Sequence, residues 1–157
     1  MKEIAVQDVM TSEVVTVCPE DSIHEAARRL TGNRISGMPV VTGSLVVGIV
    51  SESDLIESLT PPAERERGMT LLDFVMWNRE PTDLSQVPAV VEDVMSRVVA
   101  TIAPTATMWE AAAAMHRRGV KRLPVTDNDG RLIGIVSRAD LVRAIAQQQV
   151  GSGGPNV

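Results

Sequence analysis

The feature that most constrains the fold of this chain is an internal repeat, in which one sequence pattern occurs twice. With a shift of 85 residues, Val-Gln-Asp-Val-Met (6–10) aligns with Val-Glu-Asp-Val-Met (91–95). One additional residue in the second copy then changes the shift to 86, which aligns Gly-Ile-Val-Ser-Glu-Ser-Asp-Leu (48–55) with Gly-Ile-Val-Ser-Arg-Ala-Asp-Leu (134–141). Two units of about 55 residues bury little apolar surface alone, so we expect them to pack on one another about a pseudo-two-fold axis.

Each copy predicts the element order β-α-β-β-α, which is an α/β (α+β) fold. A short β-branched stretch precedes a helix that starts with a capping-box pattern, Ser22-x-x-Glu25 or Thr107-x-x-Glu110. Two strands typical of a hairpin follow, and a last helix starts at the Ser of each octet. The first strands are expected at 14–17 and 99–102, and the apolar stripes of the first helices at Ile23, Ala26, Ala27 and Leu30 and at Met108, Ala111, Ala112 and Met115.

The chain is expected to have four parts: a first repeat (1–60), an insert (61–90), a second repeat (91–146) and a disordered tail (147–157). The insert contains a short helix predicted at 70–78 between proline-rich stretches. This helix either packs on the core or docks another subunit or partner, because exposed apolar patches tend to mark contacts.

Composition and charge exclude several classes of function. The net charge of −5 and an aromatic content of 2% argue against a nucleic-acid partner, whose phosphates and bases need basic and aromatic side chains. The lone Cys18 excludes an intramolecular disulfide, and with His24 and His116 it gives too few ligands for a metal site. We expect Cys18 to be buried. No segment approaches the roughly 20 apolar residues of a membrane helix, so we expect no membrane partner and a cytoplasmic location.

The charge is distributed unevenly between the copies. Residues 6–59 carry a net charge of −5, residues 60–90 carry −2, and residues 91–145 carry +2. A small anion would therefore prefer the second copy.

The Ser-x-x-Asp of each octet has two interpretations. It can be a capping device, although capping boxes favour the longer Glu, which the first helix of each copy uses. Alternatively, the shorter Asp can point outward from the first turn, where the helix dipole favours it, and accept hydrogen bonds from the vicinal hydroxyls of a ribose.

The ordered set of motifs resembles a tandem pair of CBS domains, often called a Bateman module. The set consists of the duplicated Asp-Val-Met, the Met-Pro-Val or Leu-Pro-Val stretch, and Gly-Ile-Val-Ser-x-x-Asp, and it covers residues 6–59 and 91–145. The resemblance implies two repeats packed through their sheets, with clefts between them that bind adenosine-containing ligands.

The resemblance also implies roles for individual residues. A ligand ribose would be held by Ser137 and Asp140 and by their counterparts Ser51 and Asp54. Phosphate would be contacted by Lys121, Arg122 and Arg138. The base pocket would be lined by backbone groups of Thr16 and Thr101 and by the neighbouring Val17, Ile102, Met38, Pro39, Val120 and Pro124.

The first copy departs from this pattern. It has Ser36-Gly37 in place of Lys121-Arg122 and Glu52 in place of Arg138, so a phosphate there would face an acid. The cleft of Asp54 could stay empty, bind a less charged adenosine compound, or borrow basic residues from the second copy.

These features imply a non-catalytic regulatory module without a cofactor, which binds AMP, ADP or ATP and modulates an effector protein in trans. NAD and S-adenosylmethionine remain alternative ligands, and a homodimer is expected because dimers are common among small symmetric modules. The competing hypothesis is a structural or protein-binding dimer with degenerate clefts. An enzyme is disfavoured because the chain has neither a Gly-rich phosphate loop nor a nucleophile elbow.

Overall fold

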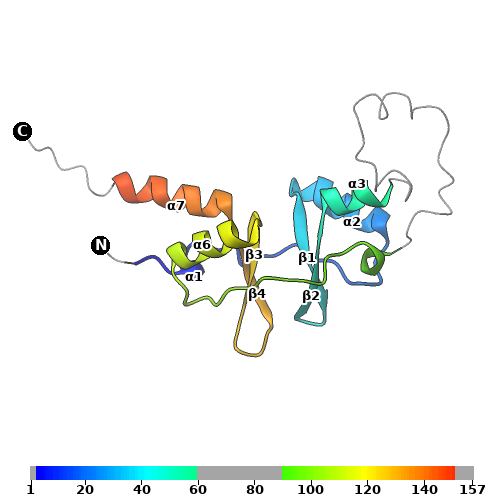
Figure 1. Ribbon diagram of the computed structural model, residues 1–157, viewed down its shortest axis with the longest axis horizontal. Coiled ribbons are helices and arrows are strands. Elements are labelled where there is room, and N and C mark those ends of the chain that lie inside the picture. Colours follow the sequence, from blue (N-terminus) through cyan, green and yellow to red (C-terminus); the bar gives the residue numbers. More distant parts are fainter. Residues whose placement is uncertain (1–2, 60–89, 151–157) are drawn as a thin grey trace, which may run out of the picture. The chain divides into compact units, whose positions relative to one another are not determined.

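The protein forms two compact units (Figure 1). A computed structural model describes residues 3–59 and 90–150 of the chain. Unit 1 combines residues 1–14, 43–46 and 98–157, and unit 2 combines residues 15–42 and 47–97. Each unit therefore contains one repeat together with the segment that leads into the other repeat.

Both units have the same mixed α+β build around a two-stranded sheet. The elements of unit 1 are α1 (Val6–Val9), α6 (Met108–Arg118), β3 (Arg122–Thr126), β4 (Leu132–Ser137) and α7 (Arg138–Val150). Unit 2 is built from α2 (Ile23–Asn33), β1 (Gly37–Thr42), most of β2 (Leu45–Ser51), α3 (Glu52–Ser58) and the 3-10 helix η2 (Val91–Asp93). The predicted fold class is confirmed.

The first helix of each repeat forms where the apolar stripe predicts it. Ala26 and Leu30 of α2, and Met108, Ala111 and Met115 of α6, are buried. At the start of α6, Thr107 and Glu110 form a complete capping box. The expected box of α2 is only half formed: Ser22 Oγ accepts from the Glu25 N–H (3.0 Å), but the Glu25 carboxylate turns toward arginine side chains instead.

The predicted first strands are shorter than expected. In 14–17 only Val17 pairs, with Val40 of β1 in parallel, and in 99–102 only Ile102 pairs, with Val125 of β3. Each pair is held by two main-chain hydrogen bonds, such as those from the Ile102 N–H to the Pro124 carbonyl and from the Thr126 N–H to the Ile102 carbonyl (both 3.0 Å). In each stretch, a single residue therefore forms the strand pairing that was expected of all four residues.

The second hairpin accommodates the additional residue of the second repeat in its turn. β3 pairs antiparallel with β4, and the register shifts between Val125 and Thr126. Asp127 Oδ1 accepts from the N–H groups of Asp129 and Arg131 (both 2.9 Å), and Gly130 takes a φ of +79° that side chains rarely adopt. The aspartate and the glycine thus close a turn that is one residue longer.

The leading Asp-Val-Met segments lie on the opposite repeat, which the sequence did not predict. In unit 1, the Val6 N–H donates to the Ala106 carbonyl (2.8 Å), and Val6 is buried with the side chains of α6, β3, β4 and α7. In unit 2, the Val91 N–H donates to the Asp21 carbonyl (2.9 Å), and Val91 completes the core of the first repeat. Each repeat thus supplies a core valine to the other.

The glycine of each octet is the point where the exchanged segment crosses the hairpin. A Cβ at Gly134 would lie 2.4 Å from Met10 Sδ and 3.1 Å from the Thr11 carbonyl oxygen. A Cβ at Gly48 would meet Met95 Sδ at 2.6 Å and the Ser96 carbonyl oxygen at 2.9 Å. Only glycine permits this approach, and β-bridges between Thr11 and Ile135 and between Ile49 and Ser96 fix it.

Two smaller expectations differ from the structure, and a third concerns residues that the structure does not describe. Helix α7 continues through residue 150, past the expected start of the tail at 147. Cys18 is exposed rather than buried, because side chains alternate along extended backbone and that of Val17 faces the core. The helix expected at 70–78 lies outside the residues that the structure describes.

Replacing Gly134 by Ala should destabilise the protein by about 1–3 kcal/mol, because the new methyl group overpacks the crossing of residues 10 and 11. Urea denaturation measures the change. The matched control is Gly32→Ala in α2, where a Cβ meets nothing within 4 Å and helix propensity should raise stability by up to about 1 kcal/mol. Equal effects of the two substitutions would contradict the crossing.

Candidate functional site

The Ser-x-x-Asp of the second repeat joins the end of β4 to the first turn of α7. Asp140 Oδ2 accepts from the Ser137 N–H (2.8 Å) and from Ser137 Oγ (3.0 Å), while the Asp140 N–H donates to Ser137 Oγ (3.3 Å). One carboxylate oxygen is therefore committed to capping the helix, and the side chain is held in a single orientation.

Ser51 and Asp54 form the same three contacts in the first repeat, at 2.8, 3.0 and 3.3 Å. Of the two interpretations of the Ser-x-x-Asp pattern, capping therefore describes Oδ2 in both repeats. The short side chain suffices because the cap residue is extended, with a φ of −128° at Ser51, so that its N–H turns toward the first turn of the helix.

The second carboxylate oxygen distinguishes the two repeats. Asp140 Oδ1 accepts from Arg143 Nη1 (3.1 Å), and Asp140 is buried, with only 7% of its surface exposed. Asp54 is half-buried, and the residue that corresponds to Arg143 is Glu57, which cannot pair with a carboxylate. The sequence reasoning missed Arg143, although its place three residues after Asp140 on a helix is a signal for such a pair.

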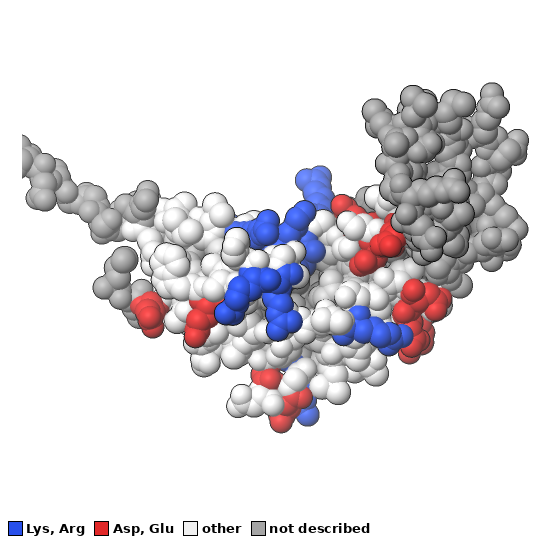
Figure 2. All heavy atoms as spheres, in the orientation of Figure 1, with Lys and Arg blue, Asp and Glu red and all other residues white. Residues whose placement is uncertain are grey.

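Basic residues flank the second cap. The Arg138 N–H donates to the Lys121 carbonyl (3.0 Å), so the starts of β3 and α7 lie side by side. Lys121 and Arg138 are exposed, and Arg122 between them is half-buried. Figure 2 shows Lys and Arg side chains gathered near the end of α6 and the start of β3. In the first repeat, the equivalent bond joins the Glu52 N–H to the Ser36 carbonyl (2.9 Å) and brings no positive charge.

The residues expected to line a base pocket differ in exposure. Thr101 is exposed, Thr16 is half-buried, and Ile102 and Val120 are half-buried against the core of unit 1. Four others are fully buried: Val17, Met38, Pro39 and Pro124. These four therefore belong to the cores, and Thr101 is the one exposed residue among the eight expected to line a base pocket.

Two negative findings concern only the described residues. Across 3–59 and 90–150, no three His, Cys, Asp or Glu side chains are grouped so that they could hold a metal ion. Within the same residues, no helix has the length and apolar character needed to cross a membrane.

Comparison with known proteins identifies the repeated unit. The CBS domain family matches residues 6–60 and again residues 91–147. The chain belongs to the CBS domain family. Both matches contain the cap aspartate described above, so the two repeats are a tandem pair of CBS domains.

Full-length relatives and solved CBS pairs support this assignment. An uncharacterised protein, MJ1426 of Methanocaldococcus jannaschii, is 32% identical over 89% of this chain and 90% of its own length. The crystal structure of CBSX2, a CBS-pair protein of Arabidopsis thaliana, in complex with AMP matches with a TM-score of 0.71 and 28% identity over 92% of this chain and 98% of that chain.

A further structure shows the fold alone. MJ1225 of Methanocaldococcus jannaschii matches with a TM-score of 0.73 at 22% identity and covers 92% of this chain. The present chain spans 48% of the length of MJ1225, so it matches about half of that protein.

Replacing Asp140 by Ala should lower the free energy of unfolding by about 1–2 kcal/mol, because it leaves the Ser137 N–H at the helix start without its acceptor. Guanidinium denaturation measures the loss. Arg143→Ala is the control: its side chain is 64% exposed, and a surface pair of this kind contributes at most about 1 kcal/mol. If the two variants lose the same stability, Asp140 is not the cap that its geometry indicates.

Proposed function

We propose that this CBS pair is a non-catalytic regulatory module that binds an adenine nucleotide, namely AMP, ADP or ATP, at its second repeat. The observation that carries the proposal is the combination of an oriented carboxylate, Asp140, with the exposed basic residues Lys121 and Arg138 on adjoining element starts. Such a combination suits a ligand that has hydroxyl groups at one end and phosphate at the other.

The cap supplies the ribose site in this proposal. Asp140 Oδ2 stays with the helix, and among residues 3–59 and 90–150 Oδ1 is held by the exposed Arg143 alone, so ribose hydroxyls could replace or join that contact. A carboxylate that accepts from two vicinal hydroxyls is a common way to hold a ribose. Ser137 Oγ, which already donates to Asp140, keeps the carboxylate in place.

The basic residues supply the phosphate site. Lys121 and Arg138 project from neighbouring backbone positions, and Arg122 follows directly in β3. Charge-assisted hydrogen bonds from lysine and arginine to phosphate are stronger than neutral ones. The first repeat has Ser36 and Glu52 at these places, so Ser51 and Asp54 form the weaker candidate.

The regulatory role is proposed by similarity. CBSX2 was solved in complex with AMP and is 28% identical to this chain. Binding would change the conformation or assembly that the pair presents to an effector protein in trans. In this proposal the nucleotide acts as a signal: the protein binds it and releases it without chemical change.

Isothermal titration with AMP, ADP, ATP, NAD and S-adenosylmethionine should give saturable binding of at least one nucleotide to the wild type. Asp140→Asn should lower the affinity at least about tenfold, because a neutral amide oxygen accepts hydrogen bonds from ribose hydroxyls more weakly than a carboxylate does. A melting temperature that rises once the ligand exceeds its dissociation constant gives an independent readout.

Asp54→Asn is the matched control and should leave the affinity unchanged. Recovery of intact nucleotide after incubation tests the non-catalytic part of the proposal. Absence of binding by all five compounds, or equal loss in the two aspartate variants, would contradict a site at the second repeat.

Exposed apolar side chains favour a second candidate function, a homodimer that acts as a protein-interaction module. In α7, Val142 is 65% exposed and Ile145 is 47% exposed, while Ile56 of α3 is 66% exposed and Leu59, directly after α3, is 49% exposed. Apolar residues three residues apart lie on one face of a helix, and such faces mark contacts. We propose that a second copy of the chain covers these helices.

Sedimentation velocity should therefore show a dimer for the wild type and a monomer for the double variant Val142→Lys/Ile145→Lys, because buried charges oppose association. Arg117→Glu, a charge change on an exposed residue of α6, is the control and should remain dimeric. A monomeric wild type at micromolar concentration would remove this candidate.

A further inference from the structure

The last helix of each repeat leaves an apolar pair exposed at the same two positions. Ile56 of α3 and Leu59, which directly follows α3, correspond to Val142 and Ile145 of α7 with the shift of 86. All four side chains are exposed, whereas the opposite sides of the two helices pack on the cores of their own units. Apolar residues at matching exposed positions of both repeats indicate a surface that another molecule covers.

Charged residues of opposite sign flank the two apolar pairs. Glu52 and Glu57 of α3 correspond to Arg138 and Arg143 of α7, and all four residues are exposed. The first charged residue of each helix lies four positions before the first residue of the apolar pair, which places the two on one helix face. The same surface is therefore flanked by acids in the first repeat and by arginines in the second.

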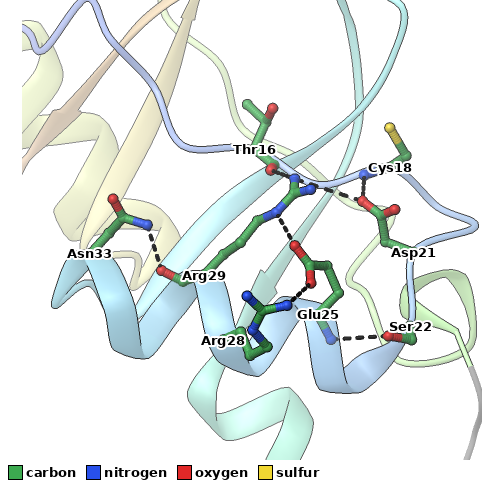
Figure 3. Close-up of polar contacts among 8 residues, drawn as sticks. All are labelled: Thr16, Cys18, Asp21, Ser22, Glu25, Arg28, Arg29 and Asn33. Carbon is green, nitrogen blue, oxygen red and sulfur yellow. Dashed lines mark hydrogen bonds and ion pairs between the residues drawn. The ribbon is translucent and has the colours of Figure 1, made fainter.

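In unit 2, the neighbouring helix α2 does not offset the acidic charge of α3. The two helices lie side by side, and α2 carries two arginines. Arg29 Nε lies 2.9 Å from Glu25 Oε1, and Arg29 Nη1 lies 3.8 Å from Asp21 Oδ2 (Figure 3). Arg28 Nη1 lies 3.1 Å from Glu25 Oε2. The charges of α2 are thus balanced within the helix and the segment that leads into it, so the acidic surplus of α3 remains.

In unit 1, the neighbouring helix α6 adds to the basic charge of α7. The two helices lie side by side, and the last turn of α6 exposes Arg117 and Arg118. Figure 2 shows Lys and Arg side chains gathered near the end of α6, and Asp and Glu side chains gathered in the region of α2 and α3. The two exposed apolar pairs therefore lie in surroundings of opposite charge.

Two-fold symmetry allows two ways of pairing these helices between two copies of the chain. Either each helix meets its own copy, or α3 of each chain meets α7 of the other, because a two-fold axis makes every contact reciprocal. The first way sets acids against acids at α3 and arginines against arginines at α7. The second way sets acids against arginines at both contacts. Juxtaposed like charges oppose association, and complementary charges favour it.

We propose that two copies of the chain form a crossed dimer, defined as a dimer in which α3 of each chain packs on α7 of the partner subunit. The two apolar pairs supply the buried centre of each contact, and the flanking acids and arginines supply its charged rim. The proposal rests on the homodimer put forward above as the second candidate function, and it gives that dimer an orientation. A second copy is the fitting occupant because the chain itself carries both complementary halves of the contact.

Cross-linking of engineered cysteines tests the crossed dimer directly. The exposed Cys18 is first replaced by Ser, and Ile56→Cys and Val142→Cys are then introduced into separate chains. After the two variants have been mixed and have exchanged subunits, a short bis-maleimide should join one chain of each kind, because residues 56 and 142 face each other in the crossed dimer. Each variant treated alone should give no cross-linked dimer. Asn128→Cys, at an exposed position of the turn between β3 and β4, is the control and should not be joined to either.

The cross-linked positions separate the possible outcomes. Cross-links between two copies of residue 56, or between two copies of residue 142, overturn the crossed dimer and leave the homodimer standing. A dimer in sedimentation velocity that gives no cross-link through either residue overturns the contact through these helices. A monomeric wild type overturns the crossed dimer together with the second candidate function, whereas the nucleotide proposal is tested separately by titration.

Exchange of the charges between the two helices is the second test. The variant Glu52→Arg/Glu57→Arg/Arg138→Glu/Arg143→Glu should still dimerise with itself, because each crossed contact keeps one acidic and one basic side. Mixed with isotopically labelled wild type, it should form at least about tenfold fewer mixed dimers than random pairing gives, since each crossed contact of a mixed dimer joins like charges. Native mass spectrometry counts the three kinds of dimer.

The same mixture in about 1 M NaCl is the control, because salt screens the charges and should return the pairing to random. Random pairing at low salt overturns the crossed dimer. An excess of mixed dimers at low salt also overturns it, because that excess is the result expected when each helix meets its own copy. If the exchanged variant loses the circular dichroism spectrum of the wild type, the cross-linking result decides.

Discussion

Both units depend on the close approach of a leading segment to a glycine in the second strand of a hairpin. At Gly134 the backbone of Thr11 crosses within the space that a Cβ would fill, and at Gly48 the backbone of Ser96 does the same. The crossing aligns two antiparallel bridges and brings a valine, Val6 or Val91, into the core of the opposite repeat. The strand that carries each glycine continues directly into the Ser-x-x-Asp cap, so the same contact also sets the position of the cap.

Duplication followed by divergence explains how the two repeats can share a fold and differ in chemistry. The positions that make the cap are the same in both, whereas the positions around it have opposite character. Glu52 and Glu57 stand where Arg138 and Arg143 stand, and the alanines 106 and 114 stand where Asp21 and Arg29 stand. The four charged residues at 52, 57, 138 and 143 lie outside the two cores and can change without a loss of packing, whereas Ala106 and Ala114 pack against the core of unit 1. The two repeats therefore share one fold, while the side chains around the cap that would determine a ligand preference differ between them.

Much of the fold could be predicted from the sequence because its determinants are local. The apolar stripes, the Ser and Thr caps and the Asp-Asn-Asp-Gly turn all act within a few residues, and the structure contains each of them. The exchange of the leading segments could not be predicted, because a Val-x-Asp-Val-Met pattern does not specify which of two similar surfaces it will cover. The lengths of the first strands were overestimated for a related reason. Their β-branched residues favour extended backbone, but only one residue in each stretch pairs with a neighbouring strand.

The candidate site, like the fold, could be predicted from the sequence only in part. Ser137 and Asp140 were recognisable as a pair, but the reach of the aspartate back to the Ser137 N–H depends on the extended conformation of the cap residue, which spacing alone does not reveal. Arg143 was overlooked because arginines on amphipathic helices usually face solvent, and only the structure places its guanidinium 3.1 Å from Asp140 Oδ1. The comparison of the two copies held a usable signal, since Arg143 corresponds to Glu57 in the first copy.

The exchanged segments also determine the order in which the molecule can be completed. The Val6 N–H bonds to a carbonyl at residue 106, so this contact closes a loop on the order of 100 residues, and long loops slow folding. During synthesis at about 5–20 residues per second, the first repeat emerges from the ribosome before its core valine, Val91, has been added. Neither repeat is complete until the other exists, so the nascent first half exposes an unfilled core for several seconds and depends on the rest of its own chain to close it.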